Sequence, residues 1–369
     1  MNNALLKIAE YYKSKINIKY TVAVTGSVGK STTVKFLSKI VGEKYKVHSP
    51  IKNFNNHIGV PLTILAAPSD TEALILEMGM NHEDEIAKLS KSTHPNIGII
   101  TSIGTAHIGN LGTRENIAKA KLELLEGMDN GIMLLPKNEP LLSRINNAFY
   151  VSRNDHCAHF SLDDQADGML TLHSILGDIK SIPFFDKREH LLFDLAMSLA
   201  AAQLMDIQNN SIINGATAIN ESDLRQRFIK MRDFTVFDDS YNASLESIVA
   251  DLRFISTYNS PKGALLADVL ELGPQSATIH EQIGYEAAHC NPDHLYLYGN
   301  FAECTAKGAI RAGMDPKSIY VNSDINSPEI TITQIMKNHF NGELILFKGS
   351  HKMDLSKIAD AIKEEESNE

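Results

Sequence analysis

The chain has 369 residues, a length that exceeds one compact core and is typical of two domains. Hydrophobic residues make up 43% and charged residues 22%, as in soluble globular proteins, and no run of about 18 apolar residues is present that could span a membrane. The net charge of −10 excludes a large nucleic-acid-binding surface, which needs clustered Lys and Arg. Because the three cysteines form no disulfide or metal pattern and the N-terminus lacks a secretion signal, we expect a cytoplasmic protein.

Short apolar runs alternate with helical patterns in the first part of the chain. We expect strands at 20–25, 73–78 and 97–103, and helices at 31–41, 86–90 and 115–128. After an apolar, alanine-rich helix at 189–205, a second alternating block predicts strands at 235–238, 263–267, 295–298 and 343–347. Strands that alternate with helices form parallel sheets covered on both faces, with ligands beyond the carboxyl ends of the strands. The predicted fold class is therefore α/β, with one domain at 1–222 and a second at 223–369.

The strongest motif is a glycine loop between an expected strand and an expected helix. Its members are Gly26, Ser27, Val28, Gly29, Lys30, Ser31 and Thr32. The loop is shorter than the general GxxxxGK[ST] pattern, but glycines still let backbone N–H groups close on phosphate oxygens beside a helix N-terminus. Lys30 is expected to reach the β- and γ-phosphates and the Ser31 hydroxyl to bind Mg²⁺, whereas the alternative is an ordinary glycine turn.

Three further side chains follow successive expected strands of the same sheet. Glu77 ends one strand, where a carboxylate can hold a hard cation, although a solvated acid is the alternative. His107 follows the next strand and Lys121 lies on the helix after it; alone, such a histidine is more often structural and such a lysine solvated. Because the carboxyl ends of parallel strands meet at one edge, we expect these side chains to gather with the loop around one crevice.

Seven segments, in family order, resemble the Mur ligases, and among these most closely the enzymes that add D-alanyl-D-alanine to a UDP-muramoyl tripeptide. They are TGSVGKSTT at 25–33, NFNNHIGVPLTIL at 53–65, EMGMNHEDEIAKL at 77–89, ITSIGTAHIGNLGTRENIAKAKLEL at 100–124, FDDSYNAS at 237–244, LADVLELG at 266–273 and KGSHKM at 348–353. The resemblance extends over nearly the whole chain. It implies a central P-loop ATPase domain with a parallel sheet and a smaller, Rossmann-like C-terminal domain that closes over the nucleotide.

The resemblance also implies a catalytic set made of Lys30, Ser31, Glu77, His107 and Lys121. Two Mg²⁺ ions are implied, with Ser31 and Glu77 on one and His107 on the other. Lys121 is implied to be carbamylated by CO₂ from bicarbonate, which turns an amine into a carboxylate-like metal ligand.

Further positions match the parts of the family motifs that contact ATP and the two substrates. For ATP, in addition to the glycine loop, they are Asp194, Arg227, Asp239, Tyr241 and Asn242. For the acyl substrate and the incoming amine, they are Asn55, Asn56, His57, Asp268, Lys348 and Ser350.

The reaction that the resemblance implies begins when a substrate carboxylate attacks the γ-phosphate of ATP, which gives ADP and an acyl phosphate. Lys30 and Mg²⁺ neutralise the developing charge, and an amine then displaces phosphate. We therefore expect an ATP-dependent ligase that forms a carbon–nitrogen bond between a small-molecule carboxylate and a small-molecule amine. Neither nucleic acid nor a membrane is an expected partner.

Several positions depart from the family pattern. No segment that matches the family's N-terminal UDP-binding domain precedes the loop. His57 stands where an acid is usual, Asp194 where an asparagine is usual, and Leu245 in place of a proline, while His351 replaces an arginine. Because Asp194 lacks an amide donor, we expect altered recognition of the base.

A retained catalytic set with altered substrate positions predicts amide-bond formation on a non-standard substrate, in a specialised metabolite or cofactor pathway. One alternative keeps the UDP-muramoyl tripeptide as substrate, with the UDP-binding domain supplied by a partner protein. Another is a non-catalytic regulatory protein or nucleotide-driven switch. A switch hydrolyses ATP without an acceptor amine, whereas a ligase needs both substrates.

Overall fold

The computed structural model describes residues 2–51 and 53–368, which divide into two units. The first unit comprises the chain up to 103 and residues 111–223, and the second comprises 104–110 and the chain from 224 onward. The short segment Gly104–Asn110 thus groups with the second unit although it interrupts the first in sequence. Both units combine helices with largely parallel sheets, which confirms the predicted fold class. None of the helices in the described ranges has the length and apolar character needed to cross a membrane.

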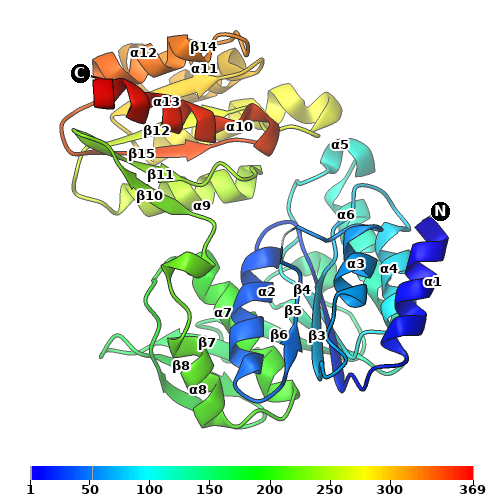
Figure 1. Cartoon of the computed structure of the whole chain (residues 1–369). Helices are drawn as coiled ribbons and strands as arrows, with labels where there is room; N and C mark the ends of the chain where they lie inside the picture. The colour runs from blue at the N-terminus through cyan, green and yellow to red at the C-terminus, as the bar shows by residue number, and fades with distance from the viewer. Residues whose placement is uncertain (1, 52, 369) are drawn as a thin grey trace. The chain divides into compact units, whose positions relative to one another are not determined.

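The first unit is built on one mixed sheet, which has nine strands within the described residues and the order β2-β3-β1-β4-β5-β6-β7-β8-β9 (Figure 1). The strands are β1 (Tyr20–Thr25), β2 (Val47–His48), β3 (Ala73–Glu77), β4 (Ile97–Ile100), β5 (Ile132–Pro136), β6 (Ala148–Arg153), β7 (Phe160–Asp164), β8 (Leu170–Ser174) and β9 (Ile179–Ile182). The pairings from β2 to β7 are parallel, and β7, β8 and β9 are antiparallel. All of β3, and all of β1 after Tyr20, is buried because helices cover both faces of the sheet.

The helices of this unit lie on the two faces of the sheet, with α2, α7 and α8 on one side and α1, α3, α4 and α6 on the other (Figure 1). They are α1 (Asn2–Lys13), α2 (Lys30–Gly42), α3 (Gly59–Leu65), α4 (Glu85–Thr93), α6 (Arg114–Leu122), α7 (Glu189–Leu204) and α8 (Asn209–Thr217). Two predicted elements are shorter than expected. The strand expected to reach 103 ends at Ile100, and the helix expected to reach 128 changes at Glu123 into a 3₁₀ turn.

Each shortened element changes where it contacts a segment distant in the sequence. After Ile100 the chain leaves the sheet, because the carbonyl of Ser102 accepts a hydrogen bond at 3.0 Å from the backbone N–H of Ser27 in the glycine loop. The Glu123 carboxylate accepts hydrogen bonds from the backbone N–H groups of Asp84 and Ala87, at 2.8 and 3.1 Å. Glu123 thereby satisfies N–H groups at the start of α4, which have no partner inside that helix.

The second unit is built on a sheet of the order β10-β11-β15-β12-β13-β14, with six strands in the described part of the chain. These are β10 (Arg227–Lys230), β11 (Phe234–Asp238), β12 (Lys262–Ala267), β13 (His294–Tyr298), β14 (Ile319–Asn322) and β15 (Glu343–Lys348). All neighbouring pairs are parallel except β10 with β11. The helices are α5 (Ile108–Leu111), which continues from the inserted segment, α9 (Leu245–Ser256), α10 (Ser276–His289), α11 (Ala302–Arg311), α12 (Pro328–Asn338) and α13 (Leu355–Asn368).

One hydrophobic core of the second unit lies between the sheet and helices α12 and α13. Val236, Leu265 and Phe347 contribute from the sheet, and Ile335 and Ile358 from the two helices. Burying an apolar side chain of this size contributes about 1.5–3 kcal/mol to stability. The core therefore fixes the ends of β11, β12 and β15, where the predicted residues of this unit stand.

Candidate active site

The glycine loop connects the end of β1 to the start of α2, as the sequence predicts. A Cβ atom on Gly26 would lie 1.9 Å from Thr101 Oγ1, and one on Gly29 would lie 2.3 Å from Asp194 Oδ1. Gly29 also has a φ of +89°, a conformation that side chains disfavour. Both glycines are therefore required by the close packing of the loop against its neighbours.

The segment that follows β4 forms hydrogen bonds to the loop. The backbone N–H of Val28 donates to Ser102 Oγ at 2.9 Å, and Thr101 Oγ1 donates to the carbonyl of Val28 at 2.5 Å. Lys30 Nζ donates to the carbonyl of Gly26 at 2.7 Å, so its ammonium lies over the loop itself. The loop thus combines a flexible cation with the N-terminus of a long helix, and both attract phosphate.

Ser31, Glu77 and Asn55 form a connected polar group beside the loop. Ser31 Oγ donates to Glu77 Oε2 at 2.5 Å, and Asn55 Nδ2 donates to Glu77 Oε1 at 2.8 Å. The Glu77 side chain at the end of β3 is buried, and the Asn55 carbonyl accepts the backbone N–H of Gly79 at 2.7 Å. Asn55 therefore orients the Glu77 carboxylate, a role that the sequence did not indicate.

The donor set at Ser31 and Glu77 fits Mg²⁺, which prefers oxygen ligands. Adjacent ligands of an octahedral ion with bonds of about 2.1 Å lie about 3 Å apart. The two oxygens of the Ser31–Glu77 pair are 2.5 Å apart, so they reach that spacing with a small outward movement. These two residues are the ones that the resemblance implied to share a metal ion.

Lys121 on α6 is buried, with 2% of its surface exposed. Burial, together with the nearby charge of Lys30, holds the pKa of its amine well below the ordinary value. Among the described residues no carboxylate forms an ion pair with it. The neutral amine is the nucleophilic form of lysine, so this side chain is chemically suited to react with an electrophile.

His107 belongs to the segment that groups with the second unit. Its ring Nδ1 lies 2.6 Å from Glu271 Oε2, and the backbone N–H of Gly109 donates to the Glu271 carbonyl at 3.0 Å. The φ of His107 is +64°, in the left-handed region that a non-glycine residue seldom adopts. His107 thus groups with the second unit, whereas Ser31, Glu77 and Lys121 lie in the first. The expected gathering of these side chains around one crevice stays a prediction, as does the role of His107 as a metal ligand.

Asp194 on α7 lies under the loop, with its side chain buried. Thr33 Oγ1 donates to its Oδ1 at 3.2 Å, and burial raises its pKa well above the ordinary value. A protonated carboxyl group has a hydrogen-bond donor, as an asparagine amide does. The raised pKa favours this protonated form of Asp194, and the altered recognition of a base expected at this position stays a prediction.

The other predicted residues of the first unit occupy the loop and the start of α3. Asn56 Oδ1 accepts the backbone N–H groups of Ile58 and Gly59, at 3.0 and 2.9 Å, and so satisfies donors at the start of α3. His57 is exposed, and Thr32 is half-buried in the first turn of α2. Their predicted roles toward substrate and ATP stay predictions.

Lys348, expected near the incoming amine, is buried at the end of β15 in a cluster of charges. Its Nζ pairs with Asp239 and, at 2.9 Å, with Asp251 Oδ2. Gln226 Nε2 donates to Asp239 Oδ2 at 3.3 Å and Asp251 Oδ1 at 3.4 Å. Burial raises the pKa of Asp251 to about 8, whereas Lys348 keeps the pKa of Asp239 low despite its burial. Asp251 and Gln226 carried no motif, so the sequence did not single them out.

Asp268 and Ser350 serve backbone groups at the carboxyl ends of the sheet strands. The buried Asp268 carboxylate accepts the backbone N–H groups of Asn300 and Phe301, at 2.8 and 3.0 Å, at the start of α11. Ser350 Oγ accepts the backbone N–H of Leu270 at 2.9 Å. Both residues fix the edge of the sheet, and their predicted contact with an amine stays a prediction.

The remaining predicted residues of this unit lie near β10 and β11. The Tyr241 ring stacks on His351, and the Arg225 guanidinium lies 4.0 Å from the centre of the Tyr241 ring. Arg227 pairs with Asp238 at 2.8 Å. Asn242 Oδ1 accepts the backbone N–H of Ala243 at 3.0 Å. His351, which stands where the family has an arginine, thus stacks on Tyr241, a residue predicted to contact the nucleotide.

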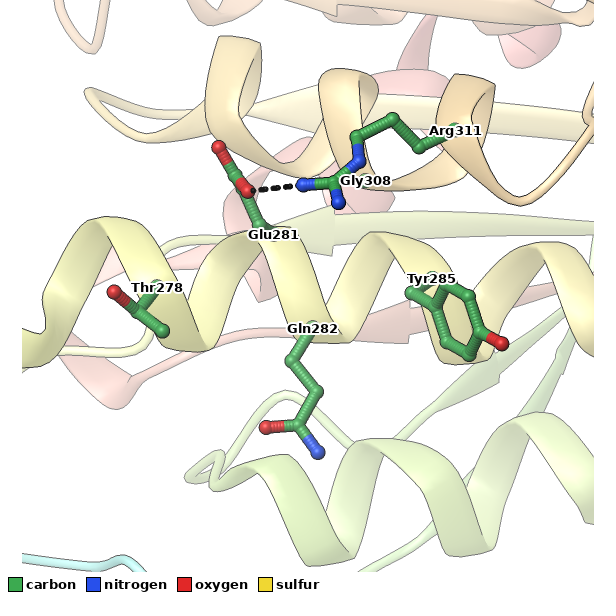
Figure 2. Close-up of a pocket in the computed structure, with 6 residues that line it drawn as sticks. All are labelled: Thr278, Glu281, Gln282, Tyr285, Gly308 and Arg311. Carbon is green, nitrogen blue, oxygen red and sulfur yellow. Dashed lines mark hydrogen bonds and ion pairs between the residues drawn. The ribbon is translucent and has the colours of Figure 1, made fainter.

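A hollow of about 220 Å³ lies over helices α10 and α11 of the second unit. Figure 2 shows the side chains that line it. Its lining residues are Thr278, Glu281, Gln282, Tyr285, Gly308 and Arg311. Glu281 and Arg311 form an ion pair at 3.2 Å across it. None of the residues predicted from sequence lines this hollow, so it is separate from the groups described above.

Comparison with known proteins places these groups in a family context. The family described as the Mur ligase middle domain matches residues 24–192. The chain is 32% identical to the UDP-N-acetylmuramoyl-tripeptide–D-alanyl-D-alanine ligase of Bacillus subtilis, over 96% of this chain and 78% of that protein. The ligase of the same name from Synechocystis is 28% identical, over 92% and 74% of the two chains.

Solved structures with the same fold include two with high structural similarity. A crystal structure of MurF from Acinetobacter baumannii superposes with a TM-score of 0.87 at 23% identity, covering 98% of this chain and 80% of that one. The MurF ligase of Thermotoga maritima, solved in complex with ADP, gives a TM-score of 0.83 at 23% identity, covering 100% and 84%. At this level of identity the likeness concerns the fold.

Proposed function

Because the chain belongs to the Mur ligase family and is an ATP-dependent, ADP-forming ligase that makes carbon–nitrogen bonds, we propose that it adds D-alanyl-D-alanine to a UDP-N-acetylmuramoyl tripeptide. The observation that carries this proposal is the identity of 32% to the Bacillus subtilis enzyme over 96% of the chain. The sequence-based preference for a specialised metabolite or cofactor substrate is corrected by these relatives, which are named for the muramoyl tripeptide. The relatives are named as ligases, which argues against the alternative of a non-catalytic regulator. The predicted partner with a UDP-binding domain stays a prediction.

In the first half of the reaction, the glycine loop would bind ATP and stabilise the transferred phosphoryl group. Its backbone N–H groups and the N-terminus of α2 would bind the phosphates, and the Lys30 ammonium, already at the loop, would stabilise the charge that develops on the γ-phosphoryl group. The substrate carboxylate oxygen attacks the γ-phosphorus, the bond to the ADP oxygen breaks, and an acyl phosphate forms. In the second half, the amine nitrogen attacks the acyl carbon, loses a proton, and phosphate leaves.

Ser31 and Glu77 would hold Mg²⁺, which supplies charge neutralisation at the phosphate oxygens when bound. Asn55 keeps the Glu77 carboxylate in place by donating to its Oε1 at 2.8 Å. The same bond leaves Oε2 facing the Ser31 hydroxyl. The positioning of the metal ligands is thus built into the strand end and does not depend on the substrate.

Lys121 would be carbamylated, by addition of its neutral amine to CO₂ with loss of one proton. Three features support this: its burial, its lowered pKa and the nearby Lys30 charge. The carbamate anion would offset the Lys30 charge, whereas an ammonium would add to it. ¹³C NMR with labelled bicarbonate should show one carbamate signal that is absent from Lys121→Ala. Added short carboxylic acids should partly restore turnover to that variant, and failure to do so in a folded protein would count against the carbamate.

The direct test measures ADP release from the purified chain with ATP, Mg²⁺, bicarbonate, UDP-N-acetylmuramoyl tripeptide and D-alanyl-D-alanine. We expect turnover that requires both substrates and stops when either is left out. Lys30→Ala should abolish it, while the matched control Lys35→Ala, which changes an exposed lysine of the same helix, should not. Turnover with a different carboxylate–amine pair, and none with this one, would refute the proposed substrates but not the ligase chemistry.

A further inference from the structure

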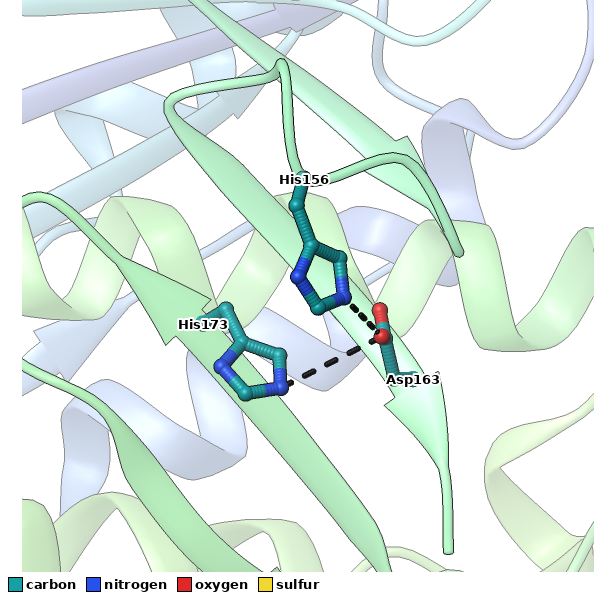
Figure 3. Close-up of side chains that lie close together, drawn as sticks. All are labelled: His156, Asp163 and His173. Atoms are coloured by element: carbon teal, nitrogen blue, oxygen red, sulfur yellow. Dashed lines mark hydrogen bonds and ion pairs between the residues drawn. The ribbon is translucent and has the colours of Figure 1, made fainter.

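A second cluster of possible metal ligands lies on the strands at the end of the first sheet, outside the residues discussed so far. Figure 3 shows its three side chains, which come from the loop after β6, from β7 and from β8: His156, Asp163 and His173. His156 Nε2 pairs with Asp163 Oδ2, and His173 Nε2 lies 4.0 Å from the same oxygen. One ligand atom from each residue lies within 4.8 Å of the other two.

The strand register explains why these residues meet. β7 and β8 are antiparallel, with Ser161 opposite His173 and Asp163 opposite Thr171. Asp163 and His173 are therefore diagonal neighbours on one face of the hairpin, because residues two apart on a strand point to the same side. The two imidazole rings lie side by side, with centres 4.5 Å apart.

Neighbouring groups hold two of the three side chains in orientation. The other ring nitrogen of His173, Nδ1, is 3.0 Å from Asp178 Oδ2, so that Nε2 faces Asp163. Ser161 Oγ donates to Asp163 Oδ1 at 2.7 Å, which leaves Oδ2 for the two histidines. A carboxylate behind a histidine, and a hydrogen bond behind a carboxylate, are the usual surroundings of metal ligands in proteins.

We propose that His156, Asp163 and His173 form a binding site for a divalent transition-metal ion of the zinc type. Two imidazole nitrogens and one carboxylate oxygen suit Zn²⁺, Co²⁺ or Ni²⁺, whereas imidazole nitrogens are poor ligands for Mg²⁺. With bonds of about 2.1 Å, ligand atoms around a tetrahedral ion lie about 3.4 Å apart. The His156–Asp163 pair has to open and the His173–Asp163 distance of 4.0 Å has to close slightly. His156 stands in a loop, which allows this adjustment.

The ion would tie the loop after β6 to the β7–β8 hairpin, and water would fill its remaining position. Its ligands share no residue with the glycine loop, Glu77 or Lys121. The site is therefore independent of the proposed ligase reaction, and either proposal can fail without the other. The matched comparison within the chain is His82 with Glu85, an exposed pair at 3.3 Å to which no second histidine is joined among the described residues.

The test is a titration of the untagged full-length chain with Co²⁺, in excess Mg²⁺ to occupy oxygen-only sites. The readout is the visible absorption of the bound ion, with Zn²⁺ used to displace it. We expect one equivalent to bind, His173→Gln and Asp163→Asn to abolish this binding, and the control His82→Ala to retain it. Asp178→Asn should weaken binding about 10- to 100-fold, the effect typical of residues that orient a metal ligand.

Thermal unfolding provides a second readout. Zn²⁺ should raise the melting temperature of the wild-type chain and of His82→Ala, because a ligand that binds only the folded state stabilises it, and should leave that of His173→Gln unchanged. Circular dichroism without metal shows whether each variant folds. Absence of a bound equivalent in the wild type, or its retention in both folded ligand variants, would overturn the site. In that case the cluster is only a hydrogen-bonded group of charges.

Discussion

Asp251 gives the sharpest test of the charge cluster around Lys348. Its carboxyl group is buried and has a pKa raised to about 8, because burial and the Asp239 charge outweigh the attraction of Lys348. Its pKa in the unfolded chain is close to the ordinary value of about 3.9. A pKa of about 8 predicts that Asp251 keeps its proton in the folded protein at neutral pH and can donate it to Asp239.

The expected size of the effect follows from this proton. Between about pH 4 and the folded-state pKa of about 8, the folded chain binds one proton more than the unfolded chain. Its free energy of unfolding therefore falls as pH rises, by about 1.4 kcal/mol per pH unit from this group alone. This loss of stability is absent below about pH 4 and reaches its full size above about pH 8. Asp251→Asn carries no titrating proton, and its amide can still donate to Asp239.

Denaturant unfolding of both proteins at several pH values between 5 and 9, followed by circular dichroism, measures this difference. The stability of the wild type relative to Asp251→Asn should fall steadily from pH 5 to about pH 8 and then level off. An exposed control on α13, Asp360→Asn, should give a curve parallel to that of the wild type. Parallel curves for Asp251→Asn and the wild type would refute the assignment of a proton to Asp251.

Three further predictions follow from single contacts. Gly29→Ala should lose ADP affinity by calorimetry and about 1–2 kcal/mol of stability, because its Cβ would lie 2.3 Å from Asp194 at a left-handed φ; unchanged affinity would contradict this packing. Without bicarbonate, Lys121→Met should be more stable than the wild type at neutral pH, because burial lowers the pKa of Lys121. Wild-type stability should therefore rise with pH, and the difference between the two proteins should close toward about pH 10. Asp268→Ala should cost about 2–3 kcal/mol in denaturant unfolding, by stranding two backbone N–H groups, and a loss no larger than that of Asp268→Asn would argue against this role.

The order of elements and the loop could be predicted because their signals are local. The strands at β1, β3 and β11 were predicted to within a residue, since each is a short apolar run between polar turns. The glycine loop stands between strand and helix as expected, and Glu77 lies beside Ser31 because adjacent parallel strands end at one edge. The elements follow from local patterns, and the Ser31–Glu77 contact follows from the general rule for parallel strands.

Contacts between distant segments could not be predicted in this way. Asp251 and Gln226 join Lys348 only because α9 and the segment before β10 come to the end of β15. The three-residue cluster at His156 depends on the register of β7 with β8, a region in which no strand was predicted. A one-residue change of register would turn Asp163 and His173 to opposite faces, and composition does not reveal register.

By itself, the sequence determined the α/β class, the phosphate-binding loop and the family motifs, because each is written in neighbouring residues whose chemistry acts locally. Only the tertiary structure decided that Asn55 orients Glu77, that the buried Asp194 packs against Gly29, and that the segment with His107 groups with the second unit. Those outcomes depend on burial and on hydrogen bonds between segments far apart in the chain. The free energies of such contacts are set by the whole packed environment, which no single motif contains.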